Sequence, residues 1–421
     1  MFIIIGGDGK EYGPVSAEKI REWIKSGRAN LSTKAKYVGT EEWHTLGEYT
    51  EFVSSPPSAG GTNLPQASGG IAVAGQPEAI EFTGDWVEYF KIWIVNVLLT
   101  IVTLGIYAAW AKVRKRRYFH GNTRVFGHTF EYLADPLKIL YGNLIVVGMF
   151  LIYSLSGAIS PLLQLPFLLL FLIAVPWFII KAYAFNARNT AWRGLRFAFK
   201  GTYGEAAMAY LLRPLLIPFT LGGIIPYVLK RQKEFVVTRH SYGATPFTFS
   251  ARTGEFYKIY LITGLFFLPI IAAYLSMFGM LAAQAAKHSG RVPPGAAGAF
   301  GLIGMLMLIG LPLALVGSFY FRSRIFNLMW NNTMLAGHQF LATMRARDLF
   351  LIHFVNGLVT LVTLGLMQPW ATVRLVKYQL SCIHISAAGN MDEFVAAAQP
   401  PVSAIGDAAS GFFDFDLGFG L

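Results

Sequence analysis

Two stretches of this sequence are nearly the same: residues 98–119 read LLTIVTLGIYAAWAKVRKRRYF and residues 358–379 read LVTLVTLGLMQPWATVRLVKYQ. Each is apolar at first, contains Thr-Leu-Gly and ends in basic residues. Aligned without a gap over 89–118 and 349–378, the chain is identical at 15 of 30 positions. Glycine permits a sharp turn, and Lys and Arg mark the cytoplasmic edge of a membrane segment. The repeat therefore predicts equivalent apolar helices that break at Thr-Leu-Gly.

The composition predicts a multi-pass α-helical membrane protein. Of 421 residues, 54% are hydrophobic and 14% are charged, and the mean hydropathy is +0.48. Residues 139–180, 259–286 and 292–321 contain no Asp, Glu, Lys or Arg. Each run exceeds the roughly 20 residues that cross a bilayer. The first has room for two antiparallel spans, with Pro161 and Pro166 expected to bracket the turn between them.

The basic excess lies in the apolar part of the chain. Residues 82–385 hold 28 basic and 8 acidic residues, whereas 1–81 hold 7 and 10, and 386–421 hold none and 5. Because these cations flank apolar runs, they fit the positive-inside pattern better than nucleic-acid binding. The single cysteine, Cys382, excludes internal disulfides and cysteine-based zinc sites.

A third Thr-Leu-Gly and a second motif complete the internal repeat. Thr220-Leu221-Gly222 precedes Pro226-Tyr227 at the same distance as the other copies precede their aromatic residue. Each apolar segment is followed by a motif with Gly and Phe that predicts two aromatic strands around a turn. The chain thus contains three short units with Thr-Leu-Gly and two long ones. The units cover residues 85–132, 135–200, 205–250, 255–342 and 348–385.

The short units leave two topologies open. If each crossed the membrane once, the protein would have seven spans, and the basic stretches 112–134 and 181–204 would lie outside. If the short units are re-entrant, the protein has four full spans plus three broken helices, and every basic motif lies in the cytoplasm. The positive-inside rule favours the second arrangement. Broken helices survive at membrane depth where protein or water covers their backbone.

Polar and helix-breaking residues inside apolar segments are candidate site residues, because burying them in a membrane is costly. One interpretation has them lining a cavity for a small polar solute, as in transporters built from repeats. The other has the Asn residues joining helices and Arg213 reaching the membrane interface. The candidates are Asn96, Thr103, Gly105, Arg213, Thr220, Gly222, Asn356, Thr363 and Gly365.

Residues 1–53 are predicted to form a small soluble α+β domain, cytoplasmic in location. FIII predicts a strand, and Ser16 is the expected N-cap of a helix. The order Tyr12-Gly13-Pro14, Trp23, Ser26-Gly27 and Trp43 resembles the bacterial GYF-like domain. That resemblance implies an aromatic platform for proline-rich peptides. The candidates are Tyr12, Pro14, Trp23, Tyr37 and Trp43; the alternative is that Trp23 and Trp43 only build the core.

Two segments flank the membrane part. Residues 54–81 are rich in Pro, Gly, Ser and Ala, which predicts a linker. Residues 386–421 form an acidic, Phe-rich tail, expected to dock on the basic motifs or to remain a disordered end.

Residues 82–385 resemble the YjgN-like family of bacterial inner-membrane proteins. The resemblance rests on EYFKI at 88–92, Asn96, TLGIY at 103–107 and WAKVR at 110–114. It implies an inner-membrane location and no assigned molecular function.

The sequence favours a non-enzymatic function. His120, His128, His240 and His338 lack acidic partners and helical ligand spacing, so we expect surface residues and no metal site. No nucleotide or catalytic motif occurs, and no cofactor is expected. Two functions remain. The protein is a transporter- or channel-like protein for a small polar solute, or it is a membrane-anchored scaffold whose N-terminal domain binds a proline-rich partner.

Overall fold

The computed structural model describes residues 77–286 and 296–387, together with parts of 2–49. The chain divides into two compact units, Met1–Gly70 and Ile71–Leu421. The predicted linker before residue 77 and the acidic tail after residue 387 lie outside the described residues.

The first unit contains an antiparallel sheet in the order β2-β1-β3-β4. Its strands are β1 (Phe2–Ile5), β2 (Glu11–Val15), β3 (Lys34–Tyr37) and β4 (His44–Thr45). Phe2, Ile4, Ile20, Ala35 and Leu46 form its buried core. Ser16 accepts a hydrogen bond from the backbone of Ile20, as expected at a helix start. Most of the predicted helix lies outside the described residues.

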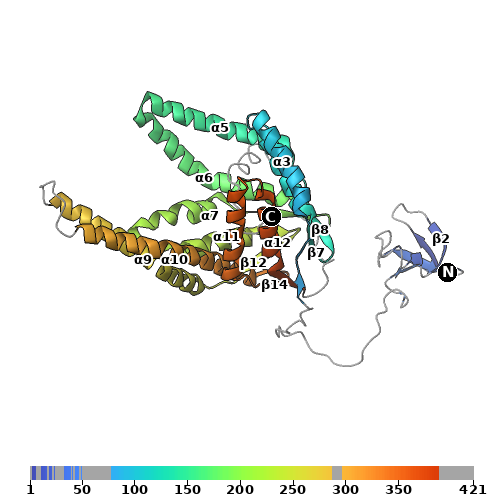
Figure 1. The fold of residues 1–421 in the computed structure, drawn as a ribbon. Helices are drawn as coiled ribbons and strands as arrows, with labels where there is room; N and C mark the ends of the chain where they lie inside the picture. Colours follow the sequence, from blue (N-terminus) through green and yellow to red (C-terminus); the bar gives the residue numbers. More distant parts are fainter. Residues whose placement is uncertain are drawn as a thin grey trace. The chain divides into compact units, whose positions relative to one another are not determined.

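The second unit contains five helix hairpins, each followed by a β-strand (Figure 1). Three hairpins are short and two are long, in the order that the sequence units predict. The helices are α3 (Trp86–Val102), α4 (Ala108–Gly121), α5 (Pro136–Ile159), α6 (Pro161–Asn189), α7 (Tyr203–Ala207), α8 (Ile225–Arg239), α9 (Thr253–Ala286), α10 (Ala296–Asn331), α11 (Ala346–Val362) and α12 (Gln368–Ser381).

Helix α3 turns back at Thr-Leu-Gly. Leu104 and Gly105 both have left-handed backbone, with φ of 50° and 92°. The Gly105 amide donates to the Thr100 carbonyl and the Leu104 amide to that of Ile101, which is a Schellman helix end. Thr103 Oγ1 then accepts from the amide of Tyr107, 3.0 Å away, at the start of α4. The turn therefore satisfies its own backbone, and α3 packs against α4.

The other two Thr-Leu-Gly sequences make the same turn. Leu364 and Gly365 have φ of 49° and 91°, and Leu221 and Gly222 have φ of 47° and 84°. In the third unit the segment before the turn is irregular. After α7 it forms a π-helix (Met208–Leu212) and two short 3-10 turns. Pro214 and Pro218 explain this, because each lacks the amide that a continuous helix needs.

Four helices, α5, α6, α9 and α10, are long and apolar enough to cross a membrane, among the residues that the structure describes. The turn between α5 and α6 lies at Ser160, whose side chain accepts from the Leu162 amide, and Pro161 begins α6. Pro166 lies inside α6. The prediction that both prolines bracket the turn is therefore wrong for Pro166, because one residue in extended conformation suffices to reverse the chain.

The strands of the second unit form one antiparallel ladder that closes on itself. Its order is β5-β15-β14-β13-β12-β11-β10-β9-β8-β7-β6. The two terminal strands, β5 (Glu78–Ala79) and β6 (Glu81–Phe82), are separated only by Ile80. The segment 78–82 thus pairs with β15 on one side and β7 on the other. The remaining strands are β7 (Thr123–Val125), β8 (His128–Tyr132), β9 (Thr190–Trp192), β10 (Leu195–Phe199), β11 (His240–Tyr242), β12 (Thr245–Phe249), β13 (Thr333–Leu335), β14 (His338–Ala342) and β15 (Ile383–Ser386).

Tight turns fix the register of these hairpins. Phe126-Gly127, Arg193-Gly194 and Ala336-Gly337 each place two left-handed residues between paired strands. This is the type I′ turn, whose twist matches that of the strands. The strand pairs that the Gly motifs predict are therefore two-residue hairpins.

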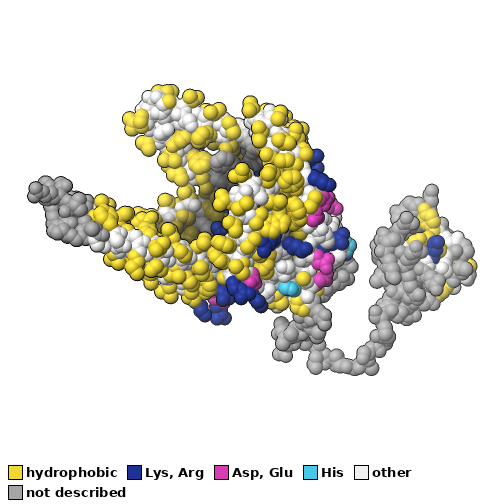
Figure 2. Space-filling model, in the orientation of Figure 1, with side chains coloured by type: hydrophobic (Ala, Val, Ile, Leu, Met, Phe, Trp, Pro, Cys, Tyr) yellow, Lys and Arg dark blue, Asp and Glu magenta, His cyan; other side chains and the backbone are white. Residues whose placement is uncertain are grey.

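The helices also form a closed circuit. Each hairpin packs on the next, and α12 of the last unit packs on α3 of the first. On the face shown in Figure 2, hydrophobic side chains cover most of the helix surfaces, while charged side chains gather toward the β-strands. The second unit is therefore a ring of helix hairpins joined to a ring of β-strands.

Candidate functional site

A cavity of about 1080 Å³ lies inside the ring. Its wall includes one face of α4 and the equivalent face of α12. On α4 and β7 the lining positions are Lys112, Lys115, Arg116, Phe119, His120 and Thr123; on α12 and β15 they are Thr372, Leu375, Val376, Gln379, Leu380 and Ile383. Their spacing of three and four residues is that of a single helix face. The second helices of the other three hairpins also reach the cavity, through Asn186, Val237 and Trp330.

The cavity extends along the length of the short hairpins. Leu364 and Gly365, in the Thr-Leu-Gly turn, line one end, and Phe126, in a β-turn, lines the other. Between Gln368 and Leu380, helix α12 alone accounts for about 18 Å of this length. The cavity therefore runs from the tip of a helix hairpin into the β-ring.

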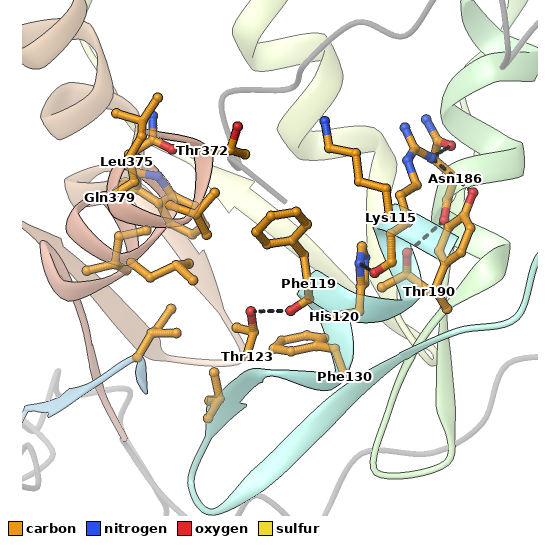
Figure 3. A pocket seen from close by; sticks show the side chains of 18 of the residues that line it. Lys115, Phe119, His120, Thr123, Phe130, Asn186, Thr190, Thr372, Leu375 and Gln379 are labelled. Atoms are coloured by element: carbon orange, nitrogen blue, oxygen red, sulfur yellow. Dashed lines mark hydrogen bonds between the residues drawn. The ribbon is translucent and has the colours of Figure 1, made fainter. Parts of the chain in front are cut away.

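The α4 side of the cavity is basic. Lys112, Lys115 and Arg116 line it, and no Asp or Glu does among the described residues. Arg116 donates to Tyr132 Oη at 3.0 Å and to Asn186 Oδ1. Figure 3 shows the Lys115 side chain extending beyond Phe119 and His120, away from the β-strands. The opposite wall, from α12, is uncharged at the equivalent positions.

Four phenylalanines form an aromatic collar within the β-ring, defined as Phe130, Phe197, Phe247 and Phe340. Adjacent ring centroids are 6.3 Å (Phe130–Phe197), 6.4 Å (Phe197–Phe247) and 6.4 Å (Phe247–Phe340) apart. All four line the cavity, as does Ile80 of the closing segment. Directly opposite residues of an antiparallel pair share a face, so the register of each hairpin aims these rings inward. The collar makes the β-ring end of the cavity apolar.

The two equivalent asparagines join the helices of their own hairpins. Asn356 Nδ2 donates to the Ala371 carbonyl at 2.9 Å, and Arg374 donates to Asn356 Oδ1 at 3.4 Å. Asn96 Nδ2 lies 3.5 Å from the Ala111 carbonyl, and Asn96 Oδ1 is buried without a partner. Asn356 also lines the cavity. Each asparagine therefore contacts the second helix of its own hairpin, and Asn356 does so at the cavity wall.

The remaining membrane candidates are distributed over the three Thr-Leu-Gly turns and the irregular segment that holds Arg213. Thr103, Thr220 and Thr363 cap the helix that follows each turn, through the amides of Tyr107, Ile224 and Met367. Gly105 and Gly222 are in the turns of two other hairpins, and only Gly365 lines the cavity. Arg213 is half-buried, with its guanidinium 6.0 Å from the Tyr227 ring centroid.

Two histidines that were expected at the surface are buried. His120 and His338 are 5% and 4% exposed, because each faces inward between the helices and the β-ring. His120 Nδ1 contacts the Arg116 carbonyl at 2.8 Å. Burial lowers the pKa of His120 to about 4, and the Arg116 charge contributes to the shift. Within 77–286 and 296–387, no group of three His, Cys, Asp or Glu side chains is placed to hold a metal.

The aromatic candidates of the first unit do not share one face. Tyr12 and Tyr37 are 45% and 37% exposed. Trp43 contacts Lys36, which neighbours Tyr37 on β3 and therefore points to the other face of the sheet. Trp23 packs against the core. The side chain of Pro14 lies outside the described residues.

Sequence reasoning missed the cavity wall and the aromatic collar. The collar had a signal, because Phe130, Phe197 and Phe340 each follow an Asn-Thr pair at the same distance. From the sequence, Lys112, Lys115 and Arg116 indicate only the cytoplasmic side of the membrane. Their spacing places them on one helix face, but the sequence does not show that this face borders a cavity.

The fold defines a multi-helix membrane protein. The chain belongs to the family DUF898, described as bacterial proteins of unknown function, whose sequence profile matches residues 77–412.

Curated relatives are inner membrane proteins named YjgN. The chain is 31% identical over 144 residues to that of Escherichia coli O157:H7, covering 34% of this chain and 36% of the relative. It is 32% identical over 152 residues to that of Salmonella typhimurium, covering 35% and 38%. The chain thus aligns with little more than a third of these relatives. No solved structure matches the chain.

Proposed function

We propose that this chain is a channel- or transporter-like protein of the bacterial inner membrane, and that the cavity inside its ring is the passage for a small solute. The observation that carries this proposal is the extent of the cavity. It reaches from Gly365 in a helix turn to Phe126 in a β-turn, and equivalent faces of α4 and α12 line it.

The chemistry of the wall supports an anionic solute. Three cations and no carboxylate line the cavity among the described residues, so its potential attracts anions. The aromatic collar supports a closure at the β-ring, because apolar constrictions resist the entry of water and ions. Together they support a passage with a basic chamber above an apolar constriction.

The proposed topology has four full spans and three re-entrant hairpins. Helices α5, α6, α9 and α10 cross the bilayer, while the short hairpins enter and return. This arrangement puts every β-strand and basic motif in the cytoplasm, in agreement with the positive-inside rule. It is supported by the Schellman turns, which leave few backbone groups unsatisfied at the hairpin tips.

Flux through liposomes tests the passage. The purified full chain is reconstituted, and iodide entry is followed by quenching of an enclosed dye. Thr372→Trp, which fills the cavity, is expected to slow entry about tenfold. Lys377→Trp, on the exposed face of the same helix, is the matched control and should leave it unchanged. Entry no faster than in empty liposomes contradicts the proposal.

Cysteine labelling tests the topology. In a Cys382→Ala background, Ser160→Cys in the α5–α6 turn is expected to react with a membrane-impermeant reagent in intact cells. Arg193→Cys, in a β-turn, should react only after the membrane is opened. Labelling of position 193 in intact cells would support seven spans instead.

A second function rests on the first unit. Tyr12 of β2 and Tyr37 of β3 are exposed aromatic residues of one sheet, with β1 between their strands. Exposed aromatic side chains are what domains use to bind proline-rich segments. The full chain in detergent is tested on an array of proline-rich peptides, with Tyr12→Ala as the variant. Loss of every signal in this variant supports a scaffold function, and an array without signals for the unaltered chain argues against it.

A further inference from the structure

The basic wall and the aromatic collar belong to one cavity, and this combination specifies its occupant further. Lys112, Lys115 and Arg116 occupy one end of the α4 face, and Phe119 and His120 follow on the same face. Phe130 of the collar lies beyond them, toward the β-ring (Figure 3). The cavity is therefore basic along one part of its wall and becomes apolar toward the β-ring.

The three cations share one face of α4. Lys112 and Lys115 are three residues apart and Lys112 and Arg116 four, and all three line the cavity. Arg116 also donates to Tyr132 Oη and to Asn186 Oδ1. An anionic group beside this face would interact favourably with three positive charges at once.

The opposite wall offers mainly apolar contact. Leu375 and Val376 of α12 occupy the positions equivalent to Lys115 and Arg116. Thr372 and Gln379 supply polar groups without charge. A simple inorganic anion would leave these apolar surfaces in contact with water, at a cost proportional to their area. An anion with an apolar body would cover them.

We infer that this cavity binds an amphipathic anion, with its charged group at Lys112, Lys115 and Arg116 and its apolar body between Leu375 and the aromatic collar. Binding of this anion does not depend on the proposed function. Only the further statement that the bound anion is also the transported solute rests on that function. Its chemistry is that of a fatty-acid carboxylate or a lipid phosphate. The site combines a few charged groups with a larger apolar lining, as ligand cavities do.

Equilibrium binding to the full chain in neutral detergent tests the inference. The probe is radiolabelled decanoate, with acetate and decanol as unlabelled competitors. Decanoate is expected to bind, while acetate, which lacks the apolar body, and decanol, which lacks the charge, should compete at least about tenfold more weakly. Equal competition by acetate would overturn the amphipathic assignment, and equal competition by decanol would overturn the role of charge.

Variants locate the site. Lys112→Gln with Lys115→Gln is expected to weaken decanoate binding about tenfold or more. Arg114→Gln, on the same helix but outside the cavity lining, is the matched control and should change it less than about twofold. Leu375→Trp fills the apolar part without altering charge and should also weaken binding. If Leu375→Trp and the double variant both bind as the unaltered chain does, the inference is wrong.

Two further measurements are needed. The first distinguishes a bilayer lipid from a free anion as the occupant, and the second distinguishes failure of the binding site from failure of the proposed passage. In vesicles of phosphatidylcholine, added phosphatidylglycerol should displace decanoate if the occupant is a bilayer lipid and should leave it bound if the occupant is a free anion; both results keep the amphipathic site. Decanoate binding without flux through liposomes would overturn the passage and retain the site. Flux that is insensitive to the double variant would overturn the site and retain the passage.

Discussion

Ala79 of β5 lies directly opposite His384 of β15, although these residues come from opposite ends of the membrane part of the chain. Three residues after Ala79, Phe82 pairs with Thr123 of β7. The single segment 78–82 therefore joins the last unit to the first. The segment that precedes the first helix hairpin thus closes the β-ring, because it pairs with the last strand on one side and the first hairpin strand on the other.

A disulfide should form across this closure. Opposite residues of an antiparallel pair have Cα atoms about 4.5–5.5 Å apart, within the reach of a disulfide. In a Cys382→Ala background, Ala79→Cys with His384→Cys is expected to cross-link on mild oxidation, as detected by mass spectrometry of proteolytic fragments. Ala79→Cys with Thr129→Cys is the control, because β7 separates these positions. Cross-linking of the control alone would contradict the closed ring.

Gly105→Ala is expected to destabilise the first hairpin by about 1 kcal/mol. A Cβ at Gly105 would meet nothing within 4 Å, so the cost is only that of φ at 92°. Thermal unfolding in detergent measures it. Gly148→Ala is the matched control, since its Cβ also has free space but its backbone is helical. That control should be neutral or stabilising. Equal destabilisation by both changes would refute the left-handed turn.

Asn356→Ala should destabilise the chain more than Asn96→Ala, by about 1 kcal/mol. Asn356 makes a 2.9 Å bond to the Ala371 carbonyl and also accepts from Arg374. Asn96 makes only a 3.5 Å contact, and its oxygen already lacks a partner. Denaturant unfolding of both variants in one detergent gives the comparison. A larger loss for Asn96→Ala would mean that its contact is stronger than its length indicates.

Acid should destabilise the fold through His120. Burial lowers the pKa of His120 in the folded chain to about 4, below its ordinary value of 6.5, so the unfolded chain binds the proton more readily. The stability that neutral His120 contributes is complete above pH 6.5 and is lost as the pH falls toward 4. The loss is about 3 kcal/mol.

Stability measured between pH 7 and pH 4 tests this prediction. His120→Gln should lose less stability over that interval than the unaltered chain. His128→Gln is the control, because the His128 side chain is exposed. An unchanged pH profile for His120→Gln would show that the pKa of His120 is the same in the folded and unfolded chain.

Local sequence predicted much of the secondary structure. In Thr-Leu-Gly, Gly adopts the left-handed conformation of the turn, and the Thr side chain accepts a hydrogen bond at the start of the next helix. Both effects involve residues that are close together in the sequence. The Gly of each strand motif likewise sets a two-residue hairpin. Pro166 was misjudged because an apolar helix tolerates proline when its packing holds the helix together.

The sequence by itself determined the class of this protein, its five units and the places where the chain reverses, because hydropathy, helix ends and turns depend on residues close together in the chain. Only the tertiary structure decided that the units close into a ring around a cavity. That closure depends on pairs such as Ala79 with His384 and on the collar from Phe130 to Phe340. Contacts between distant residues leave no local pattern, so Lys115 appeared as a surface cation until the fold placed a cavity in front of it.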